Sequence, residues 1–227
     1  MAKQMRDPLS GTVSLAIFPT LSPYLLPKLT QHLREALPNV SLKLFEYTTQ
    51  ECIKKIDSGE LDAILIAHPM RAANIEHQFL FQEKFVLACS NTHRFAKETM
   101  ISAEMIDTRE LLLLQEGHCL RDQSLDFCSI VRSQPTFDYS ATSLDTLLAM
   151  VGLNEGVTLL PSLAIPTINS NLISIKPFKE PVPSRSIYLH WRRSSAKNTI
   201  MTTLVDLIKQ VVGSAQGISL EESQHIQ

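Results

Sequence analysis

Two cysteines near the middle of the chain stand in a context suited to thiol chemistry. Cys119 follows Gly117 and His118, and Cys128 lies nine positions further along. A helix is expected to begin at Cys119, and His118 and Arg121 bring nitrogen groups that can be cationic. A helix N-terminus and nearby positive charge favour the thiolate over the thiol. A thiolate can attack a peroxide oxygen and become a sulfenic acid. The same residues also fit an inert, buried cysteine at a helix start.

The spacing of Cys119 and Cys128 favours a redox switch. Nine helical residues correspond to about 13.5 Å of rise, whereas a disulfide requires Cα atoms within about 7 Å. Cys128 shares a helical stripe with Ser124, Phe127 and Val131, so we expect it to be buried. Closing a loop of about ten residues restricts the unfolded chain by roughly 2.7 kcal/mol, similar to the cost of losing one core side chain. Two packings of comparable free energy are therefore expected.

Three polar residues are further candidates because they follow predicted strands. Thr20 and Thr49 should lie at strand carboxyl ends, where hydroxyls could hydrogen-bond a small polar ligand. They could equally be turn or capping residues. Arg192 follows a strand and could bring a fixed cation to the same cleft, or be a solvated surface arginine.

The other cysteines do not complete a metal site or a disulfide scaffold. Cys52 and Cys89 are expected to be packing residues. His118, Cys119 and Cys128 offer three potential ligands, but no second short pair accompanies them. The prediction is therefore a protein without metal or cofactor, in which any disulfide is transient.

The composition is that of a globular chain without a strong charge. It has 227 residues, with 21 Lys and Arg against 23 Asp and Glu, a formal net charge of −2. Such a chain has no strong global attraction for phosphate backbones, which disfavours DNA binding by these residues alone. No apolar run reaches the roughly 20 residues needed to span a bilayer, and the first residues lack the apolar core of a signal peptide. We expect a soluble, cytoplasmic protein.

The first half of the chain alternates strand and helix signals. Strands are predicted over residues 12–18, 40–46 and 62–67, and helices over 22–37 and 49–58. Ser22 is the expected cap of the first helix, with Pro23 at its first position. Thr48 and Glu51 form a capping-box pattern for the second helix, which should stop at Gly59. This order predicts a parallel α/β sheet.

The second half repeats the pattern less cleanly. It predicts strands over 84–89, 110–114, 137–141, 156–160 and 186–191, and helices over 120–132, 142–152 and 196–212. The polar tail after Gly213 is expected to be frayed. The economical interpretation is two α/β lobes with a cleft between them. Residues 8–83 with 192–215 would form lobe I and residues 84–191 lobe II, leaving 1–7 and 216–227 as flexible termini.

Several motifs resemble the effector domain of LysR-type transcriptional regulators. They are residues 7–11, Asp-Pro-Leu-Ser-Gly, residues 18–27, Phe-Pro-Thr-Leu-Ser-Pro-Tyr-Leu-Leu-Pro, and residues 57–63, Asp-Ser-Gly-Glu-Leu-Asp-Ala. Residues 117–123, Gly-His-Cys-Leu-Arg-Asp-Gln, with Cys128 beyond them, resemble the OxyR branch of hydrogen-peroxide sensors. Residues 141–147 and 156–164 extend the similarity, which runs from about Asp7 to about Val212.

The resemblance implies a role for each candidate residue. Cys119 would be the peroxide-reactive cysteine and Cys128 its resolving partner. Thr20 and Thr49 fall where the family places hydroxyl contacts to peroxide, and the residues around the reactive sulfur would be His118, Asp122 and Arg192. The implied fold is a pair of Rossmann-like lobes, the periplasmic-binding-protein-like (type 2) effector domain.

The resemblance also implies partners. The protein would act as a homodimer or a dimer of dimers, and oxidation would alter its packing to activate antioxidant genes. Promoter DNA and RNA polymerase would be contacted through the full-length protein, because the DNA-binding domain of the family is absent from this sequence. A glutaredoxin-type reductant would reverse the change. The alternatives are a small-molecule effector domain without redox sensing and a thiol peroxidase. We favour the sensor, which is not an enzyme.

Overall fold

The computed structural model describes residues 7–70, 72–115, 119–128, 140–141 and 143–222. The chain divides into two compact units. Unit 1 comprises residues 1–82, 186–214 and 219–227, and unit 2 comprises residues 83–185 and 215–218. The division differs from the expected lobes chiefly at residues 186–191, which belong to unit 1, where residues 188–191 pair with a strand of that unit.

Unit 1 is built on the parallel sheet that the first half of the sequence predicts. β1 (Gly11–Ile17) pairs in parallel with β2 (Val40–Glu46) on one side and with β3 (Ala63–Ile66) on the other. β9 (Ser184–Arg192) runs antiparallel to β3, and β4 (Ile75–Ser90) lies beside β9. β2 is therefore an edge strand of this sheet.

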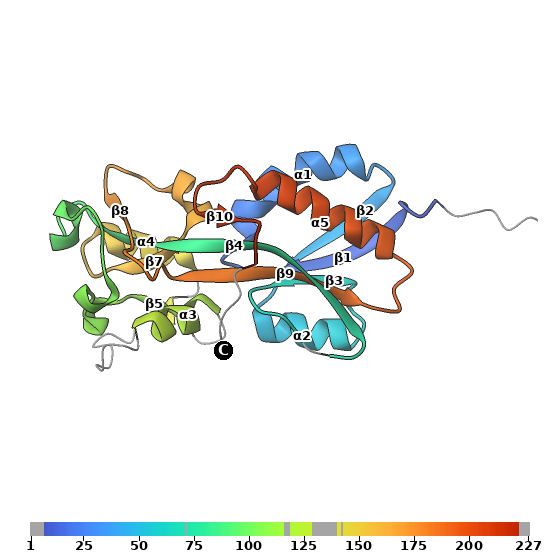
Figure 1. The fold of residues 1–227 in the computed structure, drawn as a ribbon, viewed down its shortest axis with the longest axis horizontal. Helices are drawn as coiled ribbons and strands as arrows, with labels where there is room; N and C mark the ends of the chain where they lie inside the picture. The colour runs from blue at the N-terminus through green and yellow to red at the C-terminus, as the bar shows by residue number, and fades with distance from the viewer. Residues whose placement is uncertain (1–6, 71, 116–118, 129–139, 142, 223–227) are drawn as a thin grey trace, which may run out of the picture. The chain divides into compact units, whose positions relative to one another are not determined.

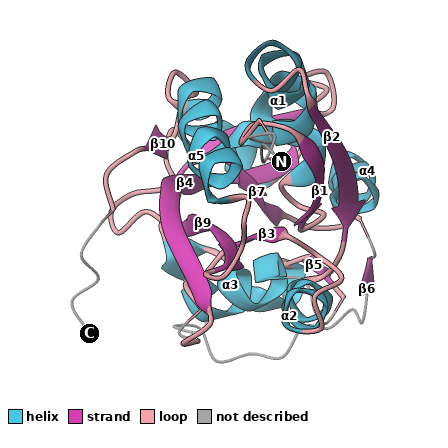
Figure 2. Ribbon diagram, turned by 90° about the vertical axis from the view of Figure 1, so that its right-hand side faces the viewer, coloured by secondary structure: helices cyan, strands magenta, loops and turns pink. Residues whose placement is uncertain are grey.

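Helices cover both faces of the unit 1 sheet. α1 (Ser22–Ala36) and α5 (Asn198–Val212) lie side by side on one face, and α2 (Thr49–Asp57) covers the other (Figures 1 and 2). Burial of apolar side chains on both faces is what a parallel sheet requires. Beneath α2 the buried cluster consists of Ala16, Cys52, Ile56, Leu61, Ile64, Ile66 and Ile75.

The two helix starts of unit 1 differ in how well the sequence predicts them. The α2 capping box is confirmed, and Gly59, with φ +83°, follows the helix end as expected. The prediction for Ser22 is wrong. The N-cap of α1 is Leu21, and the Ser22 hydroxyl instead donates to Glu46 Oε1 at 2.8 Å. A carboxylate is a stronger acceptor than a neutral group, so it recruits this hydroxyl.

Unit 2 is assembled around the second half of β4. That strand pairs antiparallel with β7 (Thr158–Pro161) and with β8 (Ile173–Pro177). β5 (Leu113–Leu114) pairs in parallel with β6 (Ser140–Ala141), and the helices are α3 (Cys119–Cys128) and α4 (Leu144–Gly152). Short 3₁₀ helices are η1 (Arg94–Lys97), η2 (Ala103–Met105), η3 (Thr108–Glu110) and η4 (Ser162–Thr167).

The predicted frayed tail is wrong for the part of it that the structure describes. β10 (Ile218–Ser219) pairs with β4, and the Tyr188 hydroxyl donates to Glu222 at 2.5 Å. Backbone pairing and a charged acceptor hold a polar segment that has little apolar surface of its own. The predicted flexible residues 1–6 and 223–227 lie outside the described residues, as do 129–132 and 137–139 of the predicted elements. Within the described chain, no helix has both the length and the apolarity to cross a membrane.

Candidate functional site

Two threonines come just after the carboxyl ends of the parallel strands β1 and β2 of unit 1. β1 and β2 are parallel, and Ile17 at the end of one lies opposite Glu46 at the end of the other. Thr20, beyond β1, is only 3% exposed. Thr49 is the first residue of α2, and its Oγ1 is buried without a hydrogen-bond partner among the described residues. A buried polar atom without a partner is costly, so this hydroxyl is a group that a small polar ligand would satisfy.

The neighbouring Thr48 has a different, structural use. Its Oγ1 accepts from the Glu51 backbone N–H at 3.4 Å, while Glu51 Oε2 accepts from the Thr48 N–H at 2.9 Å and from its hydroxyl at 2.8 Å. These hydrogen bonds lower the pKa of Glu51. Capping is therefore complete without Thr49, whose hydroxyl is not needed to hold the helix.

Arg192 lies at the opposite end of the strands from the two threonines. β9 is antiparallel to β3, with Trp191 opposite Ala63, so its carboxyl end lies where β3 begins. Arg192 Nη1 donates to the backbone oxygens of Ile56 at 3.2 Å and Leu61 at 2.7 Å. The guanidinium thus joins the end of α2 to the start of β3. The structure does not bring Arg192 together with Thr20 and Thr49. The hydrogen bonds of Arg192 to backbone carbonyls stabilise the fold.

The remaining candidate residues belong to unit 2 and to α3. Cys119 is the first residue of this helix and is half-buried, and Asp122 in its first turn is exposed. His118 lies outside the described residues. Arg121 Nη1 donates to the Leu114 carbonyl at 3.1 Å, which ties the first turn of α3 to the end of β5.

The helix separates the two cysteines of the predicted switch. Cys119 and Cys128 are the first and last residues of the ten-residue α3. The backbone of Cys128 is described and its side chain is not. At 1.5 Å per residue, the Cα atoms are about 13.5 Å apart, beyond the roughly 7 Å that a disulfide tolerates. A bridge between them therefore requires the helix to unwind, as the sequence spacing predicts.

The other two cysteines are buried, in agreement with their predicted packing role. Cys52 lies in the cluster beneath α2, and Cys89 is fully buried in β4. Burial raises the pKa of the Cys89 thiol, which disfavours the reactive thiolate. In the described part of the chain, no group of three His, Cys, Asp or Glu side chains could hold a metal ion.

Sequence reasoning missed a buried ion pair in unit 2. Glu83 and Arg185 have no exposed side-chain surface, and Glu83 Oε2 lies 2.8 Å from Arg185 Nε and 2.7 Å from Nη2. The other carboxylate oxygen accepts from the Leu163 backbone N–H at 2.8 Å. The partners are 102 residues apart, so no local pattern could have revealed the pair.

Comparison with known proteins identifies relatives over most of the chain. The hydrogen peroxide-inducible genes activator of Haemophilus influenzae is 34% identical over 197 residues, 86% of this chain and 65% of that protein. The DNA-binding transcriptional dual regulator OxyR of Escherichia coli K12 is 32% identical over 210 residues, 92% of this chain and 69% of that protein. The HTH-type transcriptional regulator EstR of Acinetobacter baylyi is 32% identical over 218 residues, 94% of this chain and 71% of that protein. The chain thus spans about two thirds of the length of these relatives.

Solved structures give the same result and confirm the expected α/β class. The reduced OxyR regulatory domain of Pseudomonas aeruginosa matches with a TM-score of 0.83 and 32% identity, covering 90% of this chain and all of that one. An oxidised OxyR structure matches with a TM-score of 0.81 and 32% identity, covering 92% of this chain and 99% of that one. Residues 6–213 match the family model of the LysR substrate binding domain. With this match over most of its length, the chain belongs to the LysR substrate binding domain family.

Proposed function

We propose that this chain is the hydrogen-peroxide-sensing regulatory domain of a LysR-type transcription activator. The observation that carries the proposal is the position of the two cysteines, at the first and last residues of one helix. A helix N-terminus stabilises negative charge on a group placed there, which suits Cys119 as the reacting thiolate. The relatives named for peroxide-inducible activation support the same role.

The chemistry proceeds in two displacement steps. The Cys119 thiolate attacks one oxygen of hydrogen peroxide, the O–O bond breaks, and hydroxide leaves to be protonated to water. The Cys128 thiol then attacks the sulfenic sulfur, forming the S–S bond as the S–O bond breaks and a second water leaves. Two thiols and one peroxide give one disulfide and two waters. Because the helix cannot contain this bridge, oxidation changes the shape of the segment.

We assign the hydroxyls of Thr20 and Thr49 to peroxide binding, with His118 and Asp122 near the reacting sulfur. Support for Thr49 is its buried and unpartnered Oγ1. Hydroxyl groups held by the fold can donate to the leaving oxygen as negative charge develops on it. Arg192 is omitted from this assignment because it hydrogen-bonds to backbone carbonyls at the opposite end of the strands.

In the full-length protein, the shape change would alter contact with promoter DNA and RNA polymerase. The domain would work in the cytoplasm, where thiols are kept reduced and a disulfide is a temporary signal. A glutaredoxin-type dithiol would restore the two thiols by exchange through a mixed disulfide. A sensor reacts once per signalling cycle, so it does not need the sustained turnover of a peroxidase.

The experiment that tests the sensor is peptide mapping by mass spectrometry after treatment with hydrogen peroxide. A Cys119–Cys128 disulfide is expected in the wild type, and Cys119→Ser should abolish it. Cys128→Ser should instead accumulate a sulfenic acid at Cys119, trapped with dimedone. The matched controls Cys52→Ser and Cys89→Ser should leave the disulfide unchanged. Oxidation confined to Cys52 or Cys89 would refute the proposal.

A small-molecule effector domain without redox sensing is the second candidate function, because EstR, a relative of similar identity, is named as a transcriptional regulator without reference to peroxide. Under it, Thr49 would contact a metabolite and Cys119 would have no signalling role. The same variants separate the two functions in a promoter-reporter assay with the full-length protein. Loss of the peroxide response in Cys119→Ser supports the sensor. A wild-type protein that does not respond to peroxide, and whose reporter activity is unchanged by Cys119→Ser, supports the effector domain.

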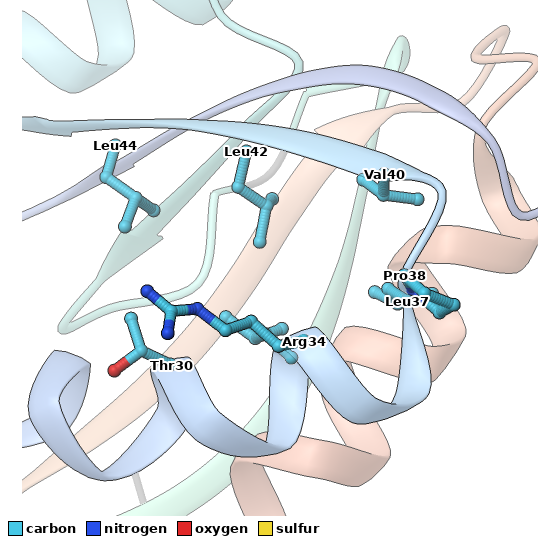
Figure 3. Close-up of a pocket in the computed structure, with 8 residues that line it drawn as sticks. Thr30, Arg34, Leu37, Pro38, Val40, Leu42 and Leu44 are labelled. Atoms are coloured by element: carbon cyan, nitrogen blue, oxygen red, sulfur yellow. The ribbon is translucent and has the colours of Figure 1, made fainter.

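We further propose that a second copy of the chain packs on the groove between α1 and β2. Figure 3 shows the side chains of Leu42 and Leu44 pointing from β2 towards α1, and Val40 lines the groove at the start of the strand. The groove has a volume of about 380 Å³. β2 is an edge strand, and its Leu44 is 36% exposed. An exposed apolar edge is a pairing surface that a second copy would cover.

Sedimentation analysis tests this interface. Leu44→Asp should shift the protein from dimer to monomer, because the new charge would be desolvated in the contact. Leu153→Asp is the matched control, since Leu153 is 71% exposed and lies in unit 2. A Leu44→Asp protein that remains dimeric would place the interface elsewhere.

A further inference from the structure

The C-terminal half of α3 is held by an aromatic contact. The rings of Phe127 and Phe178 meet edge to face, with centroids 5.0 Å apart and an interplanar angle of 76°. Phe127 is half-buried and precedes Cys128, whereas Phe178 is 2% exposed. Aromatic pairs in this geometry contribute stability beyond the area they bury.

Phe178 is fixed by the backbone on both sides of it. The Ile101 N–H donates to the Pro177 carbonyl at 2.9 Å, and the Lys179 N–H donates to the Ile101 carbonyl at 2.8 Å. Phe178 also follows directly on β8, which pairs with β4. Because this backbone is tied into the sheet of unit 2, Phe178 cannot follow Phe127 when α3 rearranges.

The first turn of α3 is anchored within unit 2. Leu120, the second residue of the helix, is buried. Arg121 is bound to the Leu114 carbonyl in addition. When Cys128 approaches Cys119, the C-terminal half is therefore the part that unwinds. Since Cys128 is the next residue, this movement separates Phe127 from Phe178.

We infer that the Phe127–Phe178 pair sets the redox equilibrium of the Cys119/Cys128 switch. The inference rests on the proposed function and adds two positioning residues that touch neither peroxide nor sulfur. The ring contact exists in the helical dithiol form and is lost in the disulfide form, so it stabilises the dithiol. Weakening the contact should make the protein easier to oxidise and harder to reduce.

The test is a thiol–disulfide titration against glutathione. Protein is equilibrated at a series of ratios of reduced to oxidised glutathione, quenched with acid and alkylated. At equilibrium, one protein disulfide and two glutathione thiols exchange with one protein dithiol and one glutathione disulfide, so electrons balance. The fraction of Cys119–Cys128 disulfide is read by peptide mass spectrometry, which gives the equilibrium constant for each variant.

Phe127→Leu should increase the equilibrium constant for disulfide formation about three- to tenfold, which lowers the reduction potential by about 15–30 mV. Phe178→Leu should give a shift of the same sign, and the double variant should shift no further than the larger single one, since either change removes the same contact. Phe95→Leu is the matched control, because Phe95 is a buried unit 2 phenylalanine whose ring neighbours are His93 and Arg94. It should destabilise the fold and leave the potential unchanged.

The outcomes separate this inference from the proposed function. A wild-type protein that forms no Cys119–Cys128 disulfide would overturn both. A wild-type disulfide with an unchanged potential in Phe127→Leu would overturn the role of the ring pair alone. An equal shift in Phe95→Leu would also overturn it, because the effect would then reflect general loss of stability.

Discussion

Replacing Thr49 by valine should stabilise the folded protein while weakening its reaction with peroxide. Valine keeps the shape of the side chain and replaces the buried hydroxyl, which has no partner among the described residues, with a methyl group. An unsatisfied buried polar group costs about 1–3 kcal/mol, and threonine and valine have similar helix propensities. We expect the free energy of unfolding to rise by about 1 kcal/mol.

Thr48→Val is the matched control one residue earlier. It removes a hydroxyl that caps α2 and contacts Glu51, so it should lower the free energy of unfolding by about 1 kcal/mol. The two neighbouring variants then differ by about 2 kcal/mol, which corresponds to a separation of roughly 1 M in the urea midpoint. This is readily measured by circular dichroism during urea unfolding.

The rate of thiol oxidation gives the second half of the test. Loss of a hydrogen-bond donor to a developing negative charge typically slows a reaction about a hundredfold. In stopped-flow mixing with peroxide, the rate of thiol oxidation should therefore fall about a hundredfold in Thr49→Val and change little in Thr48→Val. Equal destabilisation by both variants would refute the reasoning, since the Thr49 hydroxyl would then have a partner within the fold. Unchanged oxidation kinetics in Thr49→Val would remove Thr49 from the peroxide site.

Three further predictions concern charges. Glu83→Gln removes the negative charge that pairs with the buried Arg185 guanidinium, and urea unfolding should show a free energy of unfolding lower by about 3–5 kcal/mol. Glu76→Gln, in an exposed pair, should change this free energy by less than about 1 kcal/mol. Burial lowers the pKa of His190 to about 3, below its unfolded value of about 6.5. The unfolded chain therefore binds this proton more readily, so stability present above about pH 6.5 should be lost by up to about 1.4 kcal/mol per pH unit as the pH falls towards 3. In His190→Gln, the free energy of unfolding should fall less steeply with pH over the same range. Arg192→Met should cost about 1–3 kcal/mol through its two backbone acceptors and leave the peroxide rate unchanged, and a slower rate would contradict its placement away from Thr49.

Local signals explain why the first half of the fold was predictable. The alternation of β2, the capping box at Thr48 and the glycine stop at Gly59 each act within a few residues of the chain, and each is found where the sequence places it. The first half of β4 was missed because its exposed His77 and Gln78 interrupt the apolar pattern of a buried strand. β10 was missed because it has only two residues and forms by pairing with β4, which lies far away in the sequence.

The candidate site was predicted in its local part only. The helix that starts at Cys119 and the threonines after β1 and β2 follow from spacing and strand order. The prediction that Arg192 lies near the two threonines was wrong because strand direction decides at which end of the sheet a residue lies. The antiparallel pairing of β9 with β3 sets that direction, and it joins segments far apart in sequence. Ser22 failed for a related reason, since its acceptor Glu46 comes from the next strand.

The ten-residue length of α3 has a consequence for temperature. The dithiol form keeps this whole segment ordered, while a bridge between its ends must release several residues from the helix. Each released residue loses helical hydrogen bonds and packing enthalpy while it regains backbone entropy worth about 1–2 kcal/mol at 25 °C, so the release absorbs heat, as thermal unfolding does. At a fixed balance of oxidant and reductant, warming should therefore favour the bridged form, and a sensor built in this way responds to heat together with peroxide.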